Sequence, residues 1–121
     1  MTEFSDLKGK TLVVIDGGIH NSLMTFHTEE GETYFFTPVE DTCGVDDVSV
    51  TIEDICGDLQ DLIGSPLLMA EMVQEVGHNT TWTFYKLATL KGYVTIRWYG
   101  ESNGFYSEEV DFYKKEEGTD Q

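Results

Sequence analysis

Apolar and polar residues alternate in short runs along most of this chain. Segment 48–52 (VSVTI) has valine or isoleucine at every second position, and segment 92–100 repeats the pattern with Val94, Ile96 and Trp98. A period of two is typical of a strand that buries one face and exposes the other. The pattern therefore predicts a chain made mainly of β-strands.

Glycine, proline and asparagine separate these runs and mark the turns between strands. Gly31 in EEGE can adopt a positive φ, which predicts a hairpin, and Pro38 ends its second strand. Segment 67–76 fits a strand or a helix by its period, and its β neighbours favour a strand. The other runs expected to form strands are 11–16, 22–28, 32–38, 48–52, 80–90, 92–100 and 105–114.

One short helix is expected near 56–64. Leu59, Leu62 and Ile63 follow one another at helical spacing, and Gly64 can end the helix. The whole chain, 1–121, then predicts a single mainly β (α+β) domain of about seven short strands, with frayed ends at 1–8 and 115–121. A strongly curved antiparallel sheet, a small barrel and a sandwich all fit this pattern.

Charge narrows the choice of partners. The formal net charge is −16, and no lysine or arginine occurs between Lys10 and Lys86. Such a field repels nucleic-acid phosphates and anionic membranes and attracts basic protein surfaces, although acidity can also serve solubility alone. The partner-binding residues expected from it are called the acidic arc: Glu40, Asp41, Asp46, Asp47, Glu53, Asp54, Asp58 and Asp61.

No motif in the sequence indicates catalysis, a metal or a cofactor. Cys43 and Cys56 are not spaced as a metal motif and are expected to be reduced thiols, and the three histidines are scattered. No apolar run is long enough to span a bilayer, and the N-terminal residues lack the apolar core of a secretory signal. The sequence therefore predicts a non-enzymatic cytoplasmic protein.

Arg97 is the only arginine in the chain, and the last two strands predict a partner for it. A three-residue loop at 102–104 keeps the apolar faces of the two strands together and places Arg97 directly opposite Glu109. The same register puts Glu108 opposite Trp98, either at the rim of the sheet or paired with a polar group. Arg97 is then half of an ordinary cross-strand ion pair.

A second interpretation of Arg97 is a ligand anchor. Its neighbours Tyr99, Trp82 and Tyr106 could stack on a small ligand, while the guanidinium binds an anionic group. This arrangement predicts a protein that binds or sequesters a nucleotide signal. The negative net charge speaks against an anionic ligand.

Two segments, IEDICGDLQDLIGSP and TWTFYKLATLKGYVTIRWYGESNGFYSEEVDF, resemble a family of small uncharacterised proteins encoded by bacteriophages and prophage-bearing bacteria. Members carry a histidine and paired cysteines ahead of the GDL stretch, whereas VEDTCGVDD here has one cysteine and no histidine. This departure argues against a metal role for the segment. The resemblance implies phage origin and an accessory role in the host cytoplasm.

The leading hypothesis is a phage-type accessory protein that uses the acidic arc to block a basic host target, such as a nucleic-acid-handling or defence enzyme. The alternative is the small-ligand protein built on Arg97. An unrecognised enzyme and a virion component are further candidates.

Overall fold

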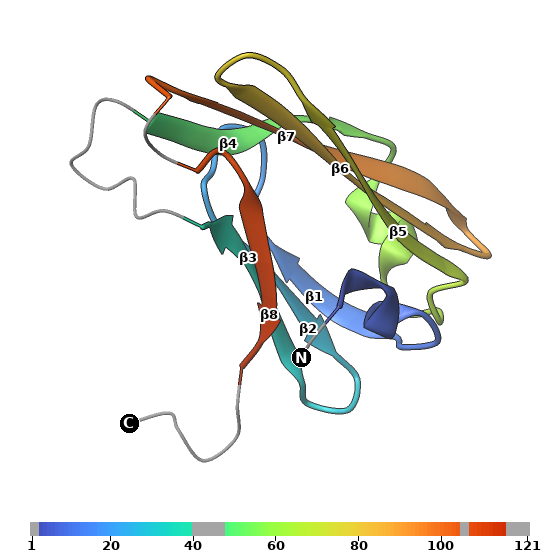
Figure 1. Cartoon of the computed structure of the whole chain (residues 1–121). Helices are drawn as coiled ribbons and strands as arrows, with labels where there is room; N and C mark the ends of the chain where they lie inside the picture. The colour runs from blue at the N-terminus through green and yellow to red at the C-terminus, as the bar shows by residue number, and fades with distance from the viewer. Residues whose placement is uncertain (1–2, 40–47, 105–106, 116–121) are drawn as a thin grey trace.

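Two antiparallel four-stranded sheets pack face to face in the computed structural model, which describes residues 3–39, 48–104 and 107–115 (Figure 1). The mainly β prediction is confirmed, and of the three architectures the structure is a sandwich whose sheets do not close into a barrel within the described residues. The first sheet has the order β1-β2-β3-β8 and the second β4-β7-β6-β5. The strands are β1 (Leu12–Asp16), β2 (Met24–Thr28), β3 (Thr33–Pro38), β4 (Val48–Cys56), β5 (Met69–Val76), β6 (Thr80–Thr89), β7 (Gly92–Ser102) and β8 (Val110–Lys114).

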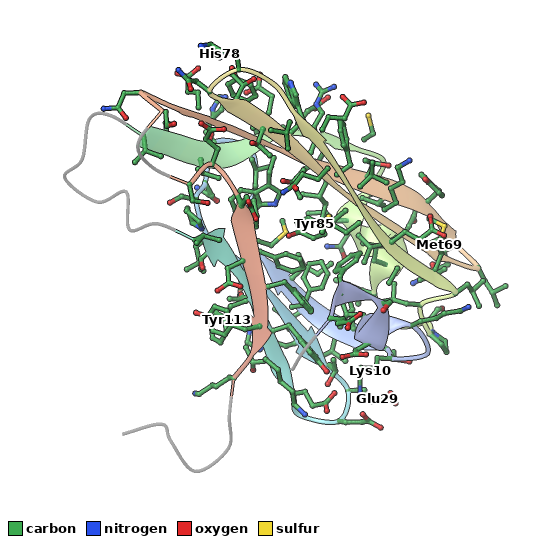
Figure 2. The ribbon with its side chains drawn as sticks, in the orientation of Figure 1. Lys10, Glu29, Met69, His78, Tyr85 and Tyr113 are labelled. Atoms are coloured by element: carbon green, nitrogen blue, oxygen red, sulfur yellow. The ribbon has the colours of Figure 1, made fainter. Side chains whose placement is uncertain are left out.

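The core lies between the sheets and follows the predicted alternation. In β7 the buried residues are Val94, Ile96 and Trp98, and Trp98 is the largest fully buried side chain of the domain. In β6 the alternate residues Tyr85 and Leu87 are buried in the same way. Burial of each large apolar side chain stabilises the fold by about 1.5–3 kcal/mol. Figure 2 places Tyr85 between the two sheets.

The N-terminal lead-in, expected to be frayed, contributes to this core. Residues Phe4–Leu7 form a 3-10 turn, η1, and Phe4 and Leu7 are buried. The Phe4 ring lies 4.7 Å from the Tyr85 ring and 5.5 Å from the Phe112 ring, measured between centroids. Phe4 therefore joins the two sheets, since Tyr85 belongs to one sheet and Phe112 to the other.

The helix expected near 56–64 is a four-residue 3-10 turn, η2 (Leu59–Leu62). Strand β4 continues as far as Cys56, and Gly57 follows with φ of +103°. Gly64 adopts φ of +89°, so the segment between these two glycines has room for a single turn. Leu62 is fully buried, and its burial holds the turn on the core.

Segment 67–76 is a strand, β5, as favoured, and the hairpin of β2 and β3 is confirmed. The predicted hairpin of the last two strands is wrong. Strand β7 pairs with β4 and β6, whereas β8 pairs with β3 in the opposite sheet. The Cα partners of Arg97 are therefore Asp54 and Phe84, not Glu109, and those of Trp98 are Ile52 and Thr83, not Glu108.

The reason for this difference lies at Gly100, which faces the interior of the sandwich. A Cβ atom at Gly100 would collide with the backbone carbonyl of Glu108. The absence of a side chain lets the segment that leads to β8 pass over β7 at Glu108, after the chain has left the second sheet beyond Ser102. The Glu108 carboxylate accepts hydrogen bonds from the hydroxyls of Thr81 (3.0 Å) and Ser102, which tie the crossing to β6 and β7.

Glu32 is the centre of an ion-pair cluster at the far end of the first sheet. The Nζ atoms of Lys10 and Lys114 each lie 2.9 Å from its carboxylate, and the Tyr34 hydroxyl donates to the same group at 3.3 Å. The hydrogen bonds from Lys10 and Lys114 lower the pKa of Glu32 to about 2. The cluster links residues that come before β1, before β3 and at the end of β8.

Replacing Gly100 by alanine should lower the free energy of unfolding by about 1–3 kcal/mol, because the new methyl group overlaps the Glu108 backbone. Urea unfolding measures the change. Gly18 is the matched control, since nothing lies within 4 Å of a Cβ built there. Equal losses of unfolding free energy in Gly100→Ala and Gly18→Ala would contradict the close packing of the Glu108 backbone on Gly100.

Replacing Glu32 by glutamine should lower the free energy of unfolding by about 2 kcal/mol at pH 7. Because the folded-state pKa is depressed, this stabilisation is complete above the unfolded pKa near 4.5 and disappears as the pH falls toward 2. The difference between wild type and variant should shrink over that window. Glu30→Gln is the control, because Glu30 lies 3.6 Å from Lys10 and is 70% exposed, and its effect should stay below about 1 kcal/mol.

Candidate protein-binding face

The outer face of the β4-β7-β6-β5 sheet carries a cluster of large side chains, here called the aromatic face: Trp82, Phe84, Tyr99 and Arg97. All four are half-buried, and none belongs to the core cluster. Trp82 lies opposite Tyr99 and Phe84 opposite Arg97 on β6 and β7. These residues take the strand positions that alternate with the buried ones, so the same periodicity that fills the core also builds this surface.

The rings of the aromatic face contact one another. The Trp82 and Tyr99 centroids are 4.5 Å apart with the planes tilted by 49°. Trp82 and Phe84, two residues apart on one strand, are nearly parallel at 6.4 Å. Such aromatic pairs contribute about 0.5–1.5 kcal/mol beyond the area they bury. The cluster is therefore a fixed platform.

Arg97 packs against this platform and pairs with Asp54. Its guanidinium carbon lies 5.2 Å from the centroid of the Trp82 ring, a cation–π distance. Its Nη2 atom is 3.4 Å from the Asp54 carboxylate, and both side chains are about two-fifths exposed (41% and 42%). An ion pair this exposed contributes about 0–1 kcal/mol. The Nε atom of Arg97 is buried without a hydrogen-bond partner among the described residues.

A β-bulge explains why Asp54 reaches Arg97. The pairing of β4 with β7 shifts between Ile52 and Asp54, so Glu53 is the additional residue of the bulged strand. The shift keeps Ile52 and Ile55 toward the core and places Asp54 directly opposite Arg97. Asp54 therefore pairs with the guanidinium, while the charge of Glu53 acts on Tyr99.

Further carboxylates surround the aromatic face. On β5, Glu75 lies opposite Trp82 and Glu71 lies opposite Lys86. On β7, Glu101 accepts a hydrogen bond from the Tyr99 hydroxyl at 3.2 Å. Desolvation, then this hydrogen bond and the nearby carboxylates, raise the pKa of Tyr99 above its ordinary value. The face therefore has an aromatic centre that includes Arg97, and a mainly acidic rim in which Lys86 lies opposite Glu71.

The structure places the described members of the acidic arc at two separate positions. Glu53 and Asp54 lie on β4 beside the aromatic face. Asp58 caps η2 by accepting from the backbone N–H of Gln60 at 2.9 Å, and the Asp61 backbone carbonyl accepts from Thr89. The remaining arc residues, together with Tyr106 of the ligand hypothesis, lie outside the described residues: Glu40, Asp41, Asp46 and Asp47.

The ligand hypothesis placed Arg97, Tyr99 and Trp82 together, and the structure brings these three into one cluster. Sequence reasoning missed Phe84 and the rim residues Glu71, Glu75 and Glu101. A signal was present in segment 80–90, where aromatic residues occupy both alternating sets of positions. One set faces the core and the other must lie outside, so such a strand exposes aromatic surface.

The described residues also show whether a metal site, a membrane-spanning helix or a cavity accompanies the aromatic face. No three His, Cys, Asp or Glu side chains in this part of the chain converge as metal ligands. No helix among those described is long and apolar enough to cross a membrane. A polar cavity of about 390 Å³ is lined by Ser49, Asn79, Glu101 and Ser102, and neither Arg97 nor Trp82 borders it.

Fold and face together define a small acidic β-sandwich with an exposed aromatic sheet surface. The chain belongs to a family described as a domain of unknown function (DUF7448), which matches residues 5–112. The match therefore includes the aromatic face, the whole second sheet and the first sheet as far as Phe112 in β8. Comparison with the curated proteins and with the solved structures gives no match.

A double-mutant cycle on Arg97→Ala and Asp54→Ala should give a coupling energy of about 0.2–1 kcal/mol, since both groups are solvated. Urea unfolding in low salt provides the four stabilities. In 1 M salt the coupling should fall toward zero. The control is the cycle of Glu109→Ala and Arg97→Ala, which should show no coupling. A coupling energy in that pair would support a hairpin of β7 with β8 and contradict the pairing described above.

Proposed function

We propose that this chain is a non-enzymatic protein-binding domain that docks the aromatic face on a basic surface of a partner protein. The observation that carries the proposal is the arrangement of Trp82, Phe84, Tyr99 and Arg97 in one half-buried cluster on an open sheet face. Tryptophan, tyrosine and arginine are the residues that dominate binding energy at protein interfaces. Their preformed contacts also reduce the entropy lost on binding.

The rim supports a partner of positive charge. Glu53, Glu71, Glu75 and Glu101 border the face, while Arg97 is paired with Asp54 and Lys86 lies opposite Glu71. Charges at the rim of an interface mainly accelerate association and select the partner. The net charge of −16 on the whole chain likewise attracts a positively charged partner and accelerates its association.

The proposal also includes the more specific predictions made from the sequence. In it, the chain is a phage-encoded accessory protein that acts in the host cytoplasm and blocks a nucleic-acid-handling or defence enzyme. The resemblance of the two quoted segments supports the phage origin. The acidic surface supports the target class, because enzymes that bind nucleic acid carry basic grooves.

The nucleotide-binding alternative stays a prediction. The Arg97 guanidinium, which would bind the nucleotide, already pairs with Asp54 and lies on Trp82. An anionic ligand would have to replace this carboxylate contact. Several carboxylates around the same face would repel such a ligand. These contacts favour the protein partner over the nucleotide.

Affinity capture with matched variants tests the proposal. Immobilised wild type, Trp82→Ala and Tyr113→Ala are exposed to the same bacterial lysate, and retained proteins are identified by mass spectrometry. A basic protein should be retained by wild type and Tyr113→Ala. Once this partner has been purified, Trp82→Ala should bind it about 30-fold more weakly than wild type. That factor corresponds to a loss of about 2 kcal/mol of binding free energy, as is typical of a dominant interface residue.

Tyr113 is the matched control because it is a partly exposed aromatic residue that stacks on Phe35, on the outer face of the other sheet. Titration of the purified pair at 50 and 500 mM salt should show at least a tenfold loss of affinity at high salt. Equal retention by all three proteins, or affinity that does not change with salt, would contradict the proposal.

A further inference from the structure

The two long sides of the sandwich, where an edge strand of one sheet faces an edge strand of the other, are built differently. On the side of β1 and β4, backbone hydrogen bonds close the gap. The N–H of His20 donates to the carbonyl of Ile52, and the N–H of Ile52 donates to the carbonyl of Asn21. Residues after η2 bond to β1 through the N–H of Gly64 and the carbonyl of Leu12.

The opposite side, here called the open seam, lies between β5 and β8, which are edge strands of different sheets (Figure 1). The turn η1 covers one part of it, since Phe4 contacts both Tyr85 and Phe112. Beyond η1, every β5 residue from Glu71 to Val76 is exposed. The described residues therefore leave this end of the seam uncovered.

A groove of about 680 Å³ occupies the open seam. Its lining is mainly apolar and comes from both sheets and from η1: Phe4, Ala70, Met72, Tyr85, Val110 and Phe112. Glu3 and Glu71 add carboxylates to the lining. The groove thus combines a free strand edge, an apolar floor and negative charge, which are the features that an extended peptide needs from its receptor.

Apart from the charges of Glu71 and Glu75, strand β5 lacks the features that usually protect an edge strand from further pairing. It pairs with β6 in an unbroken register from Met69 to Val76, without a bulge. It contains no proline and no lysine, the residues that commonly block pairing with a further strand. Met72, Val73 and Val76 are 50%, 41% and 73% exposed, so apolar side chains are presented on both faces of the strand.

We propose that the open seam binds an extended segment of a partner protein in which apolar residues alternate with lysine or arginine. The segment pairs with the free edge of β5 and places its apolar side chains in the groove over Tyr85 and Phe112. Its cations meet Glu71, Glu75 and Glu3. This is strand addition, in which main-chain hydrogen bonds give affinity and alternate side chains give specificity.

Charge selects this occupant over a second copy of the chain. Antiparallel pairing of β5 with itself about Val73 would set Glu71 opposite Glu75 of the second copy, twice. Like charges directly opposite each other destabilise a strand pair. The net charge of −16 on each copy adds a general repulsion that a cationic segment replaces by attraction.

The probe is a fluorescein-labelled, capped peptide of four Lys-Val repeats, followed by fluorescence anisotropy on the full chain. It should bind wild type, and Met72→Lys should weaken binding at least tenfold by placing a cation in the groove. Val14→Lys is the matched control, since Val14 is 44% exposed on β1, at the closed side, and gains the same charge. The added positive charge weakens the attraction of the peptide equally in both lysine variants. Apart from this shared effect, the affinity of Val14→Lys for the peptide should change by less than about twofold. The affinity of Trp82→Ala, whose charge is unchanged, should also change by less than about twofold.

Hydrogen exchange on the wild-type protein locates the peptide without any substitution. Saturating peptide should slow exchange of the amides in 71–76 at least tenfold and leave those of β1 unchanged. Equal binding of a Glu-Val repeat peptide, no binding of the Lys-Val peptide up to 1 mM, or protection elsewhere would overturn the proposal. A concentration-dependent dimer that Met72→Lys dissociates would assign the seam to a second copy and would also overturn it.

The seam shares the rim residues Glu71 and Glu75 with the aromatic face, but its groove and strand edge include neither Trp82 nor Tyr99. Peptide binding that is lost in Met72→Lys, together with partner capture that Trp82→Ala does not weaken, would support the seam alone. Partner capture that Trp82→Ala weakens, together with no binding of the peptide to wild type, would support the face alone. The two experiments can therefore fail separately.

Discussion

The passage of the chain across Gly100 determines the rest of the architecture. The backbone of Glu108 lies where a side chain on β7 would otherwise project, and Glu108 belongs to the segment that connects β7 of one sheet with β8 of the other. The hydroxyls of Thr81 and Ser102 satisfy the Glu108 carboxylate, so a charged group is accommodated at the crossing. A hairpin at this position would have kept both last strands in one sheet and left β3 with β2 as its single neighbour.

Three features of the surface follow from that crossing. Because β8 pairs with β3, β7 is free to take β4 as its second neighbour, which gives Arg97 its contact with Asp54. The strand order then places β5 and β8 at sheet edges, with the groove between them. The Glu32 cluster fixes the end of β8 through Lys114, and the hydrogen bonds of Glu108 fix the residues that precede β8.

Local periodicity predicted the strands well because it reports burial, and burial is decided residue by residue. Val94, Ile96 and Trp98 face the core as their alternation required. Pairing between strands was harder to predict, because it depends on contacts distant in sequence. The Ser102–Gly104 turn favoured a hairpin, and only the missing side chain at Gly100 distinguished the true path. Helical spacing at Leu59 and Leu62 was satisfied by one 3-10 turn, since Gly57 and Gly64 restrict its length.

The candidate surfaces show the same division between local and distant information. Trp82, Tyr99 and Arg97 could be grouped because their strands are adjacent in sequence. The acidic arc was a run in sequence, yet its described members separate because η2 uses Asp58 as a cap while β4 carries Glu53 and Asp54. Ion pairs with carboxylates engage Lys10, Lys114 and Arg97 of the seven cations. With 23 acidic residues, the domain cannot neutralise its own surface, and a cationic partner is the counterpart that its charge distribution favours.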